Sequence, residues 1–258
     1  MIEAFNNNEI DVGIGLTEAW VAGLGKRFAD EKGERPIQTY HITGKYTTSP
    51  LLWALSTGGK RTDIQSVQEL KGKQVGISRY GSGSHIMSYV LADQQGWLEE
   101  GKAPFEFVVC GPFAPLREAV NSGKADFFMW EHFTSKKFYD NGELRRIGEI
   151  PTPWDGWHIA SHRVHADPRI INTLLPALEK GVEHFEKHKE EAVELISTTM
   201  DYSKEDAEEW YKTVSFPKQP GTVDEAMIRK TFDLLKKAGV LNDKSPEWST
   251  YFSEDDRP

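Results

Sequence analysis

Between residues 74 and 150 the sequence alternates short apolar segments with amphipathic ones, and no other feature constrains the fold as strongly. Each apolar segment has the length of a buried strand. The segment after it places apolar residues three or four positions apart, as a helix with one buried face does. Strands that alternate with helices form a parallel or mixed sheet with helices on both faces. We therefore predict an α/β fold, with strands at 74–78, 105–109, 125–130 and 144–150 and helices near 86–91, 115–123 and 134–139.

The flanking segments carry weaker patterns. Before residue 74 we expect strands at 10–16, 36–40 and 51–55, a helix from Thr17 to about Gly33 and a short helix at 63–70. After residue 161 the chain is predicted to be helical, with one long helix from near Pro168 through Ile196, a second from Ser203 and a third after the capping-box sequence Thr222-Val223-Asp224-Glu225. The acidic tail at 253–258 is expected to be mobile.

The order of these segments predicts two lobes. The chain enters the alternating region after Lys71-Gly72-Lys73 and leaves it through a proline-rich stretch at 151–154, before one more strand at 157–161. A region that is entered and left in this way indicates an inserted lobe joined by two crossings, which is the geometry of a hinge. We predict that 1–73 and 158–258 form lobe 1, and that 74–157 form lobe 2 with the hinge crossings.

Composition narrows the function classes. The net charge is −9, and the 31 basic residues are mixed among 40 acidic ones, so no basic stripe favours nucleic acid or an anionic membrane surface. The apolar runs are shorter than the ~18–20 residues of a membrane span, so no direct membrane insertion is expected. Cys110 is the only cysteine, so no disulfide can form within the chain. The first residues lack the pattern of a secretory signal, and we predict a cytoplasmic location.

The sequence Arg79-Tyr80-Gly81-Ser82-Gly83-Ser84-His85 joins a predicted strand to a predicted helix. The first N–H groups of a helix have no partner within the helix and carry the positive end of its dipole. With the hydroxyl groups of Ser82 and Ser84 they would suit a carboxylate, sulfonate or phosphate. The alternative is an ordinary capped turn. The spacing matches neither a P-loop nor the dinucleotide-binding fingerprint.

Two further strand ends carry acidic residues. Thr17 and Glu18 follow the first strand, and Trp130 and Glu131 end a strand in the alternating region. A carboxylate that faces a cleft could accept a hydrogen bond from an amine or hydroxyl of a ligand. Each carboxylate could instead complement the dipole of the helix that it precedes or begins, so both interpretations stay open.

Trp154 and Trp157 lie in the predicted hinge, where either indole could stack on a ligand or pack between the lobes. His184 and His188 are four apart on a helix, but Phe185 stands where a zincin has its glutamate, so no metal site is predicted. We assign His158, His162 and His165 to surface or packing roles. No Gly-x-Ser-x-Gly elbow occurs, and no catalytic residue is predicted.

Three of these segments together resemble a known family. The resemblance is to the nitrate, aliphatic-sulfonate and taurine-type binding proteins of ABC transporters. In chain order, the segments that carry it are Asn8-Glu9-Ile10-Asp11-Val12-Gly13, then Leu70-Lys71-Gly72-Lys73-Gln74-Val75-Gly76-Ile77-Ser78 with the Gly81–His85 turn, then Ala125-Asp126-Phe127-Phe128-Met129-Trp130-Glu131. That family of type II periplasmic-binding-protein-like proteins includes the fungal thiamine-pyrimidine synthases. The resemblance covers residues 1–165 well, and it is strongest to an uncharacterised fungal branch.

The resemblance implies a two-lobe type II periplasmic-binding-protein fold with hinge strands and C-terminal helices. It implies that a small, anionic organic solute binds between the lobes, with Ser82, Gly83, Ser84 and His85 at the anion and Thr17, Glu18, Trp130, Glu131, Trp154 and Trp157 around the remainder. If the chain is exported, a transporter is a possible partner. It also implies that the family's first strand and helix, roughly 50 residues, precede the point where this sequence starts.

Two other functions stay open. The chain could be an enzyme of the thiamine-pyrimidine-synthase type with a pyridoxal-type cofactor, although the cysteine-rich motif and the cofactor residues of those enzymes have no counterpart here. It could also be a sensory module that keeps the fold without a ligand. We expect a binding protein that is not an enzyme and has no cofactor.

Overall fold

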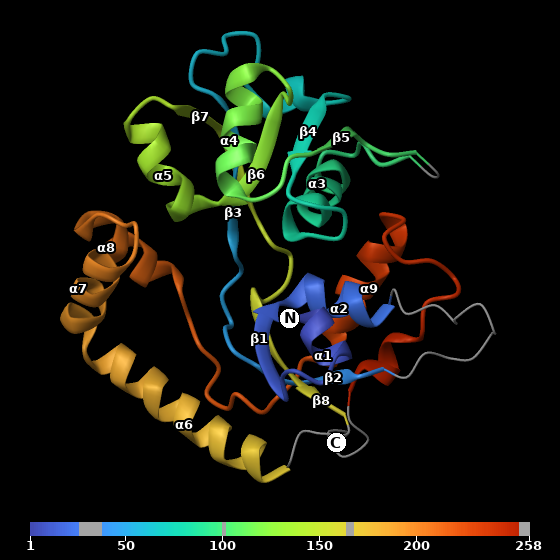
Figure 1. Ribbon diagram of the computed structural model, residues 1–258, viewed down its shortest axis with the longest axis vertical. Helices are drawn as coiled ribbons and strands as arrows, with labels where there is room; N and C mark the ends of the chain where they lie inside the picture. Colours follow the sequence, from blue (N-terminus) through green and yellow to red (C-terminus); the bar gives the residue numbers. More distant parts are fainter. Residues whose placement is uncertain (26–37, 100–101, 164–167, 253–258) are drawn as a thin grey trace. The chain divides into compact units, whose positions relative to one another are not determined.

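The computed structural model describes residues 1–25, 38–99, 102–163 and 168–252, and Figure 1 traces their helices and strands along the chain. The chain divides into two compact units. The first comprises Met1–Pro50, Pro153–Met200 and Ala207–Pro258, and the second comprises Leu51–Thr152 and Asp201–Asp206. The predicted tail at 253–258 and the predicted continuation of the first helix to Gly33 lie outside the described residues.

The sheet of the first unit has, in the described part of the chain, the order β1-β8-β2, with every pair antiparallel. These strands are Val12–Leu16, Trp157–His162 and Tyr40–Lys45. Next to this sheet, Phe5 stacks on Tyr40 with ring centroids 5.1 Å apart, and Trp20 packs against both rings. All three side chains are fully buried or nearly so, and they form the aromatic core of the unit.

The helices of the first unit follow the predicted patterns with two changes. They are α1 (Ile2–Asn6), α2 (Thr17–Gly25), α6 (Pro168–Lys187), α7 (Lys189–Thr199) and α9 (Glu225–Lys237), with a 3₁₀ turn at Trp248–Tyr251; α8 (Lys204–Thr213) begins in the second unit. The predicted single helix from Pro168 through Ile196 is wrong, because His188 leaves helical geometry and separates α6 from α7. The predicted capping box at Thr222–Glu225 is wrong: α9 begins two residues later, with Asp224 as its N-cap, whose carboxylate accepts a hydrogen bond from the Met227 N–H.

The second unit contains the alternating region, and its mixed sheet confirms the predicted α/β class. Among the described residues the strand order is β5-β4-β6-β3-β7. Strand β4 is parallel to β5 and β6, whereas β3 is antiparallel to β6 and β7. The strands are β3 (Leu52–Gly58), β4 (Gln74–Ile77), β5 (Glu106–Val109), β6 (Phe127–Glu131) and β7 (Leu144–Pro151).

Helices α3 (Gly83–Gln94), α4 (Phe113–Ser122) and α5 (His132–Asp140) alternate with these strands. Phe127 and Phe128 are neighbours in β6, so their side chains point to opposite faces of the sheet. Both are fully buried, Phe127 against Phe105 and Phe128 in a cluster with Leu116 of α4. Both faces of the sheet are therefore covered, as the alternation predicts.

The first predicted lobe boundary differs from the boundary of the units. Residues 51–73 were assigned to lobe 1, but β3 pairs with β6 and β7 and so belongs to the second unit. The second crossing also falls earlier, between Thr152 and Pro153, and Asp201–Asp206 joins the second unit. An apolar pentapeptide predicts a strand, but it does not say which sheet the strand enters.

Two other local predictions were shifted. The strand expected at 36–40 runs instead from Tyr40 to Lys45, with an irregularity between Ile42 and Gly44 that breaks its alternating pattern. The helix expected at 63–70 is a single 3₁₀ turn at Val67–Leu70. That turn begins with a capping box, in which the Glu69 carboxylate accepts from the Ser66 N–H and the Ser66 side chain accepts in return.

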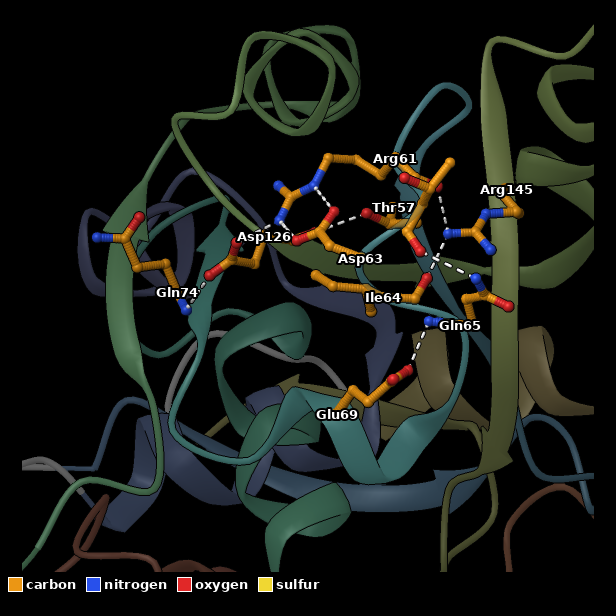
Figure 2. A network of polar contacts seen from close by, with 10 residues as sticks. Thr57, Arg61, Asp63, Ile64, Gln65, Glu69, Gln74, Asp126 and Arg145 are labelled. Atoms are coloured by element: carbon orange, nitrogen blue, oxygen red, sulfur yellow. Dashed lines mark hydrogen bonds and ion pairs between the residues drawn. The ribbon is translucent and has the colours of Figure 1, made fainter.

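A network of polar contacts holds the segment between β3 and β4 (Figure 2). The Asp126 carboxylate lies between Arg61 and Gln74, accepting from the Arg61 guanidinium at 2.8 Å and from the Gln74 backbone N–H at 2.9 Å. Arg61 also makes two 2.7 Å contacts to Asp63. From β7, the Arg145 guanidinium donates to the backbone carbonyls of Arg61 and Ile64. The segment is therefore tied to Asp126, directly before β6, and to Arg145 of β7.

Replacement of Asp126 is expected to loosen this segment. Asp126→Ala leaves the Gln74 N–H without its acceptor and the partly buried Arg61 without one of its two carboxylates, so the free energy of unfolding should fall by about 2 kcal/mol. Asp63→Ala removes the other carboxylate, whose side chain is 55% exposed and screened by solvent, and should cost clearly less than Asp126→Ala. Urea titrations of both variants measure the difference, and equal losses would contradict the assignment of Asp126 as the central group.

Candidate functional site

The predicted anion-binding turn lies in the second unit, between the end of β4 at Ile77 and the start of α3 at Gly83. Ser82 is the N-cap of α3, and its Oγ accepts from the His85 N–H at 3.3 Å. The Oγ of Ser84 turns back and accepts from the Ser78 N–H at 3.0 Å. Both serine side chains are buried, so their hydroxyl groups hold the shape of the turn.

The N–H groups of Gly83 and Ser84 differ from the serine hydroxyl groups in their hydrogen bonding. Over the described ranges of the chain, neither donates a hydrogen bond to a protein acceptor. They begin α3, where the helix dipole is positive. The two amides therefore form a donor pair suited to an anionic oxygen.

An aromatic cluster surrounds His85 beside this turn. The imidazole packs edge-on against Tyr80, Tyr89 and Phe107, with ring centroids 4.8 to 5.3 Å away. Its Nδ1 accepts from the Gly81 N–H at 3.2 Å, so this assignment places the ring proton on Nε2. The cluster fixes the ring beside the Gly81 N–H, and Tyr80 at its edge is 62% exposed.

Glu131 and Trp130 lie at the end of β6, as predicted, and both side chains have protein partners. The Glu131 carboxylate caps α5: Oε1 accepts from the Phe133 N–H at 3.0 Å, and Oε2 accepts from the Thr134 N–H at 2.6 Å. Its hydrogen bonds are thus those of the capping interpretation. The Trp130 indole stacks on Phe113, with centroids 5.0 Å apart and planes 17° apart.

In the first unit, Thr17, Glu18 and Trp154 come together with two residues that the sequence analysis did not select. Thr17 and Glu18 begin α2 and are fully buried, and the Trp154 indole N–H donates to Glu18 Oε2 at 2.9 Å. The Thr17 hydroxyl donates to the Asp155 carbonyl and lies 2.8 Å from His158 Nδ1. These five residues form what we call the Glu18 cluster.

Burial dominates the electrostatics of the Glu18 cluster. Loss of solvation raises the pKa of the Glu18 carboxyl from its ordinary value of 4.5 to about 7, against the opposing effect of hydrogen bonds from its own backbone N–H and from Trp154. Burial lowers the pKa of His158 from 6.5 to about 3, and the positive charge of Lys45 acts in the same direction. Lys45 itself pairs with Asp155 at 2.7 Å.

Trp157 is placed differently from Trp154. It begins β8, and its backbone N–H donates to the Thr47 hydroxyl at 3.1 Å. His158, the next residue, was assigned to surface or packing, and it is fully buried beside Thr17. The contact follows from the β1–β8 register, which pairs Leu16 with Trp157 and Gly15 with His158.

The two units, one with an antiparallel sheet and the other with a mixed sheet, define with their helices a protein of the periplasmic-binding-protein fold. The chain belongs to the family defined by the conserved CA3427 gene product of Candida albicans, which exhibits that fold. It is 42% identical to that protein over 93% of this chain and 76% of that one, with a TM-score of 0.81. The family model described as Ca3427-like PBP matches residues 53–150.

More distant solved structures share the fold. The alkanesulfonate-binding protein SsuA from Xanthomonas axonopodis pv. citri, bound to MOPS, is 17% identical, with a TM-score of 0.69 over 95% of this chain and 81% of that one. The periplasmic aliphatic sulphonate-binding protein SsuA from Escherichia coli is 19% identical, with a TM-score of 0.66 over 95% and 76%. A comparison with curated proteins finds no match.

Within the described ranges, no helix combines the length and the apolar character that crossing a membrane requires.

Proposed function

We propose that this protein binds a small, anionic organic solute, such as a sulfonate, a carboxylate or a pyrimidine-like compound with an acidic group. The observation that carries the proposal is the pair of N–H groups of Gly83 and Ser84, which lack a protein acceptor in the described part of the chain. Two amides at a helix start can donate to two oxygens of one anion, and hydrogen bonds to a charged acceptor are worth about 1.5–3 kcal/mol each.

The rest of the proposed site consists of side chains that neighbouring residues hold in place. His85 lies in its aromatic cluster two residues after Gly83, and the ring of Tyr80 is exposed and could contact an organic group. We also propose Thr17, Glu18 and Trp154 of the first unit as contacts of the solute. We propose that the units close on the solute about the crossings at 50–51 and 152–153, because only a ligand that interacts better with the closed state can shift the population toward it.

The comparisons favour binding over catalysis. The SsuA proteins are described as sulfonate-binding proteins, and they have the same fold as this chain. We therefore propose a binding protein and not an enzyme. We propose a cytoplasmic location, or a transporter partner if the protein is exported. The second proposal follows the SsuA protein of Escherichia coli, which is described as periplasmic.

A pair of substitutions at Gly83 tests the proposed anion site. Gly83 is the first helical residue of α3, a position where proline fits the backbone and removes only the N–H. The preceding Ser82 has φ −79° and ψ 166°, the extended geometry that a following proline requires. Gly83→Pro should weaken binding of methanesulfonate, acetate or phosphate, whichever the wild type prefers, by about tenfold or more.

Gly83→Ala is the matched control, because it adds a side-chain carbon and keeps the amide. Titration calorimetry and thermal shift of the three proteins give the comparison. Equal affinity of the proline and alanine variants would remove the amide from the site. No binding of any sulfonate, carboxylate, phosphate or acidic pyrimidine by the wild type would overturn the proposed function.

A further inference from the structure

Two buried polar atoms of the Glu18 cluster lack a hydrogen-bond partner. They are Glu18 Oε1 and His158 Nε2, and no donor or acceptor among the described residues satisfies either atom. Both side chains are 0% exposed. An unsatisfied buried polar group costs about 1–3 kcal/mol, so two of them in one cluster call for an explanation.

The hydrogen bonds of Thr17 determine which kind of partner His158 needs. The Thr17 hydroxyl has one proton, which it donates to the Asp155 carbonyl. The 2.8 Å contact between the Thr17 oxygen and His158 Nδ1 is therefore a hydrogen bond donated by the imidazole. With the ring proton on Nδ1 and the ring neutral, Nε2 is a bare acceptor. The missing partner of His158 is a donor.

The surroundings of Glu18 determine which kind of hydrogen-bond partner its Oε1 needs. Trp154 donates to Oε2, so one oxygen of the carboxyl is occupied and the other is not. Lys45, the cation next to the Glu18 cluster, is paired with Asp155 at 2.7 Å. Among the described residues, no ion pair joins a cation to Glu18. Burial without a cation favours the protonated carboxyl, and a protonated Oε1 is a donor. The missing partner of Glu18 is an acceptor.

We propose that Glu18 Oε1 and His158 Nε2 form a subsite for an uncharged amide-type group, which donates its N–H to His158 and accepts from Glu18 through its carbonyl oxygen. The two residues belong to one set of contacts: Thr17 bonds to His158 and its neighbour Glu18 accepts from Trp154, so both join the start of α2 to residues 154–158. This inference rests on the proposed function and narrows it: the group of the solute that the first unit binds is of the amide type.

The chemistry of the subsite disfavours two alternatives. A second carboxylate or sulfonate could not donate to the bare His158 Nε2, and it would lie next to an acidic side chain. An ammonium group could donate to both atoms only if Glu18 lost its proton, so its binding requires a change of protonation that an uncharged group does not require. A planar group with one N–H and one carbonyl satisfies both atoms without any charge.

The test uses the full-length protein and three small probes. Benzamide has the donor and the acceptor, acetophenone has the acceptor alone, and benzenesulfonate reports on the anion site. Nitrogen-15 NMR of the imidazole side chains follows His158 directly in the wild type, so the result does not depend on a variant that folds. Saturating benzamide should shift the His158 Nε2 resonance, and acetophenone at the same concentration should leave it in place.

Variants add a quantitative comparison. His158→Phe removes the acceptor and should weaken benzamide binding at least tenfold in calorimetry. His41→Phe replaces another histidine of the same sheet and should leave the affinity within twofold. Circular dichroism verifies that each variant is folded. Benzenesulfonate binding, sensitive to Gly83→Pro, should be the same in all of these proteins.

The outcomes separate the two proposals. If benzamide fails to shift His158 Nε2, or if acetophenone shifts it equally, the subsite is overturned and the two atoms are satisfied by ordered water only. Benzenesulfonate binding in that same protein would still support the proposed function. If benzenesulfonate does not bind, the proposed anion site is overturned, and this conclusion does not depend on the result with benzamide.

Discussion

Glu18→Gln is expected to raise the free energy of unfolding relative to wild type by about 3 kcal/mol at pH 8, and to leave it nearly unchanged at pH 4.5. The reason is that the wild-type carboxyl is fully buried, and its ionised form has no cation beside it. Glutamine has nearly the same shape, keeps an acceptor for the Trp154 indole N–H and never ionises.

The direction follows from the raised pKa. In the unfolded chain Glu18 releases its proton near its ordinary pKa of 4.5, whereas in the folded protein it holds the proton up to a pKa of about 7. Below pH 4.5 both states are protonated, and the stability associated with the protonated carboxyl is fully present. Between these values the unfolded state binds fewer protons, so the wild type loses stability as the pH rises. Above pH 7 the loss is complete.

Urea unfolding at closely spaced pH values from 4.5 to 8 measures the difference between variant and wild type. Glu225→Gln is the control, because Glu225 also lies in the first turn of a helix but its side chain is half-exposed. It should change stability by less than about 0.5 kcal/mol at every pH. Parallel curves for Glu18→Gln and wild type would contradict the raised pKa of Glu18.

The fold of the second unit could be predicted largely from sequence because its signals are local. Each of β4 to β7 is an apolar run beside a helix with its own apolar face, and these are neighbours along the chain. The placement of β3 could not be predicted in the same way. Its residue Trp53 pairs with Glu131 and Ile150, about 80 and 100 positions away, and an apolar run carries no information about a partner at that distance.

The candidate site divides along the same line. The cap at Ser82 and the amides of Gly83 and Ser84 follow from the chemistry of one turn, so the sequence locates them. The Glu18 cluster depends on the antiparallel pairing of β1 with β8. Thr17 and His158 are 141 positions apart, and without the register nothing in the sequence distinguishes this histidine from a packing residue.

The Glu18 cluster therefore contains two groups whose effects on stability oppose each other. Burial favours the neutral form of both, but the neutral form of a carboxyl is the protonated one and that of an imidazole is the deprotonated one. Glu18 weakens the fold as the pH rises, and His158 weakens it as the pH falls. The wild-type profile of stability against pH combines both, and substitution of either residue exposes the other.

His158→Asn is expected to remove a large part of the acid sensitivity. Its side-chain amide N–H can still donate to Thr17, as Nδ1 of the imidazole does, but it does not titrate. In the wild type the pKa of His158 is lowered from 6.5 to about 3, so the stability of the neutral ring is fully present above pH 6.5 and is lost as the pH falls toward 3. The loss is about 1.4 kcal/mol per pH unit and on the order of 5 kcal/mol over the whole window.

Chemical unfolding at pH 7 and at pH 4.5 is enough to see the effect. Between these two conditions the stability of His158→Asn relative to wild type should rise by about 3 kcal/mol. His188→Asn replaces an exposed histidine between α6 and α7 and should follow the wild type within about 0.5 kcal/mol. Because His41 is partly buried and its pKa is lowered to about 4, some acid sensitivity should persist in the His158 variant. If the variant and the wild type lose the same stability on acidification, His158 is protonated in the folded protein, and the bare Nε2 acceptor of the proposed subsite does not exist.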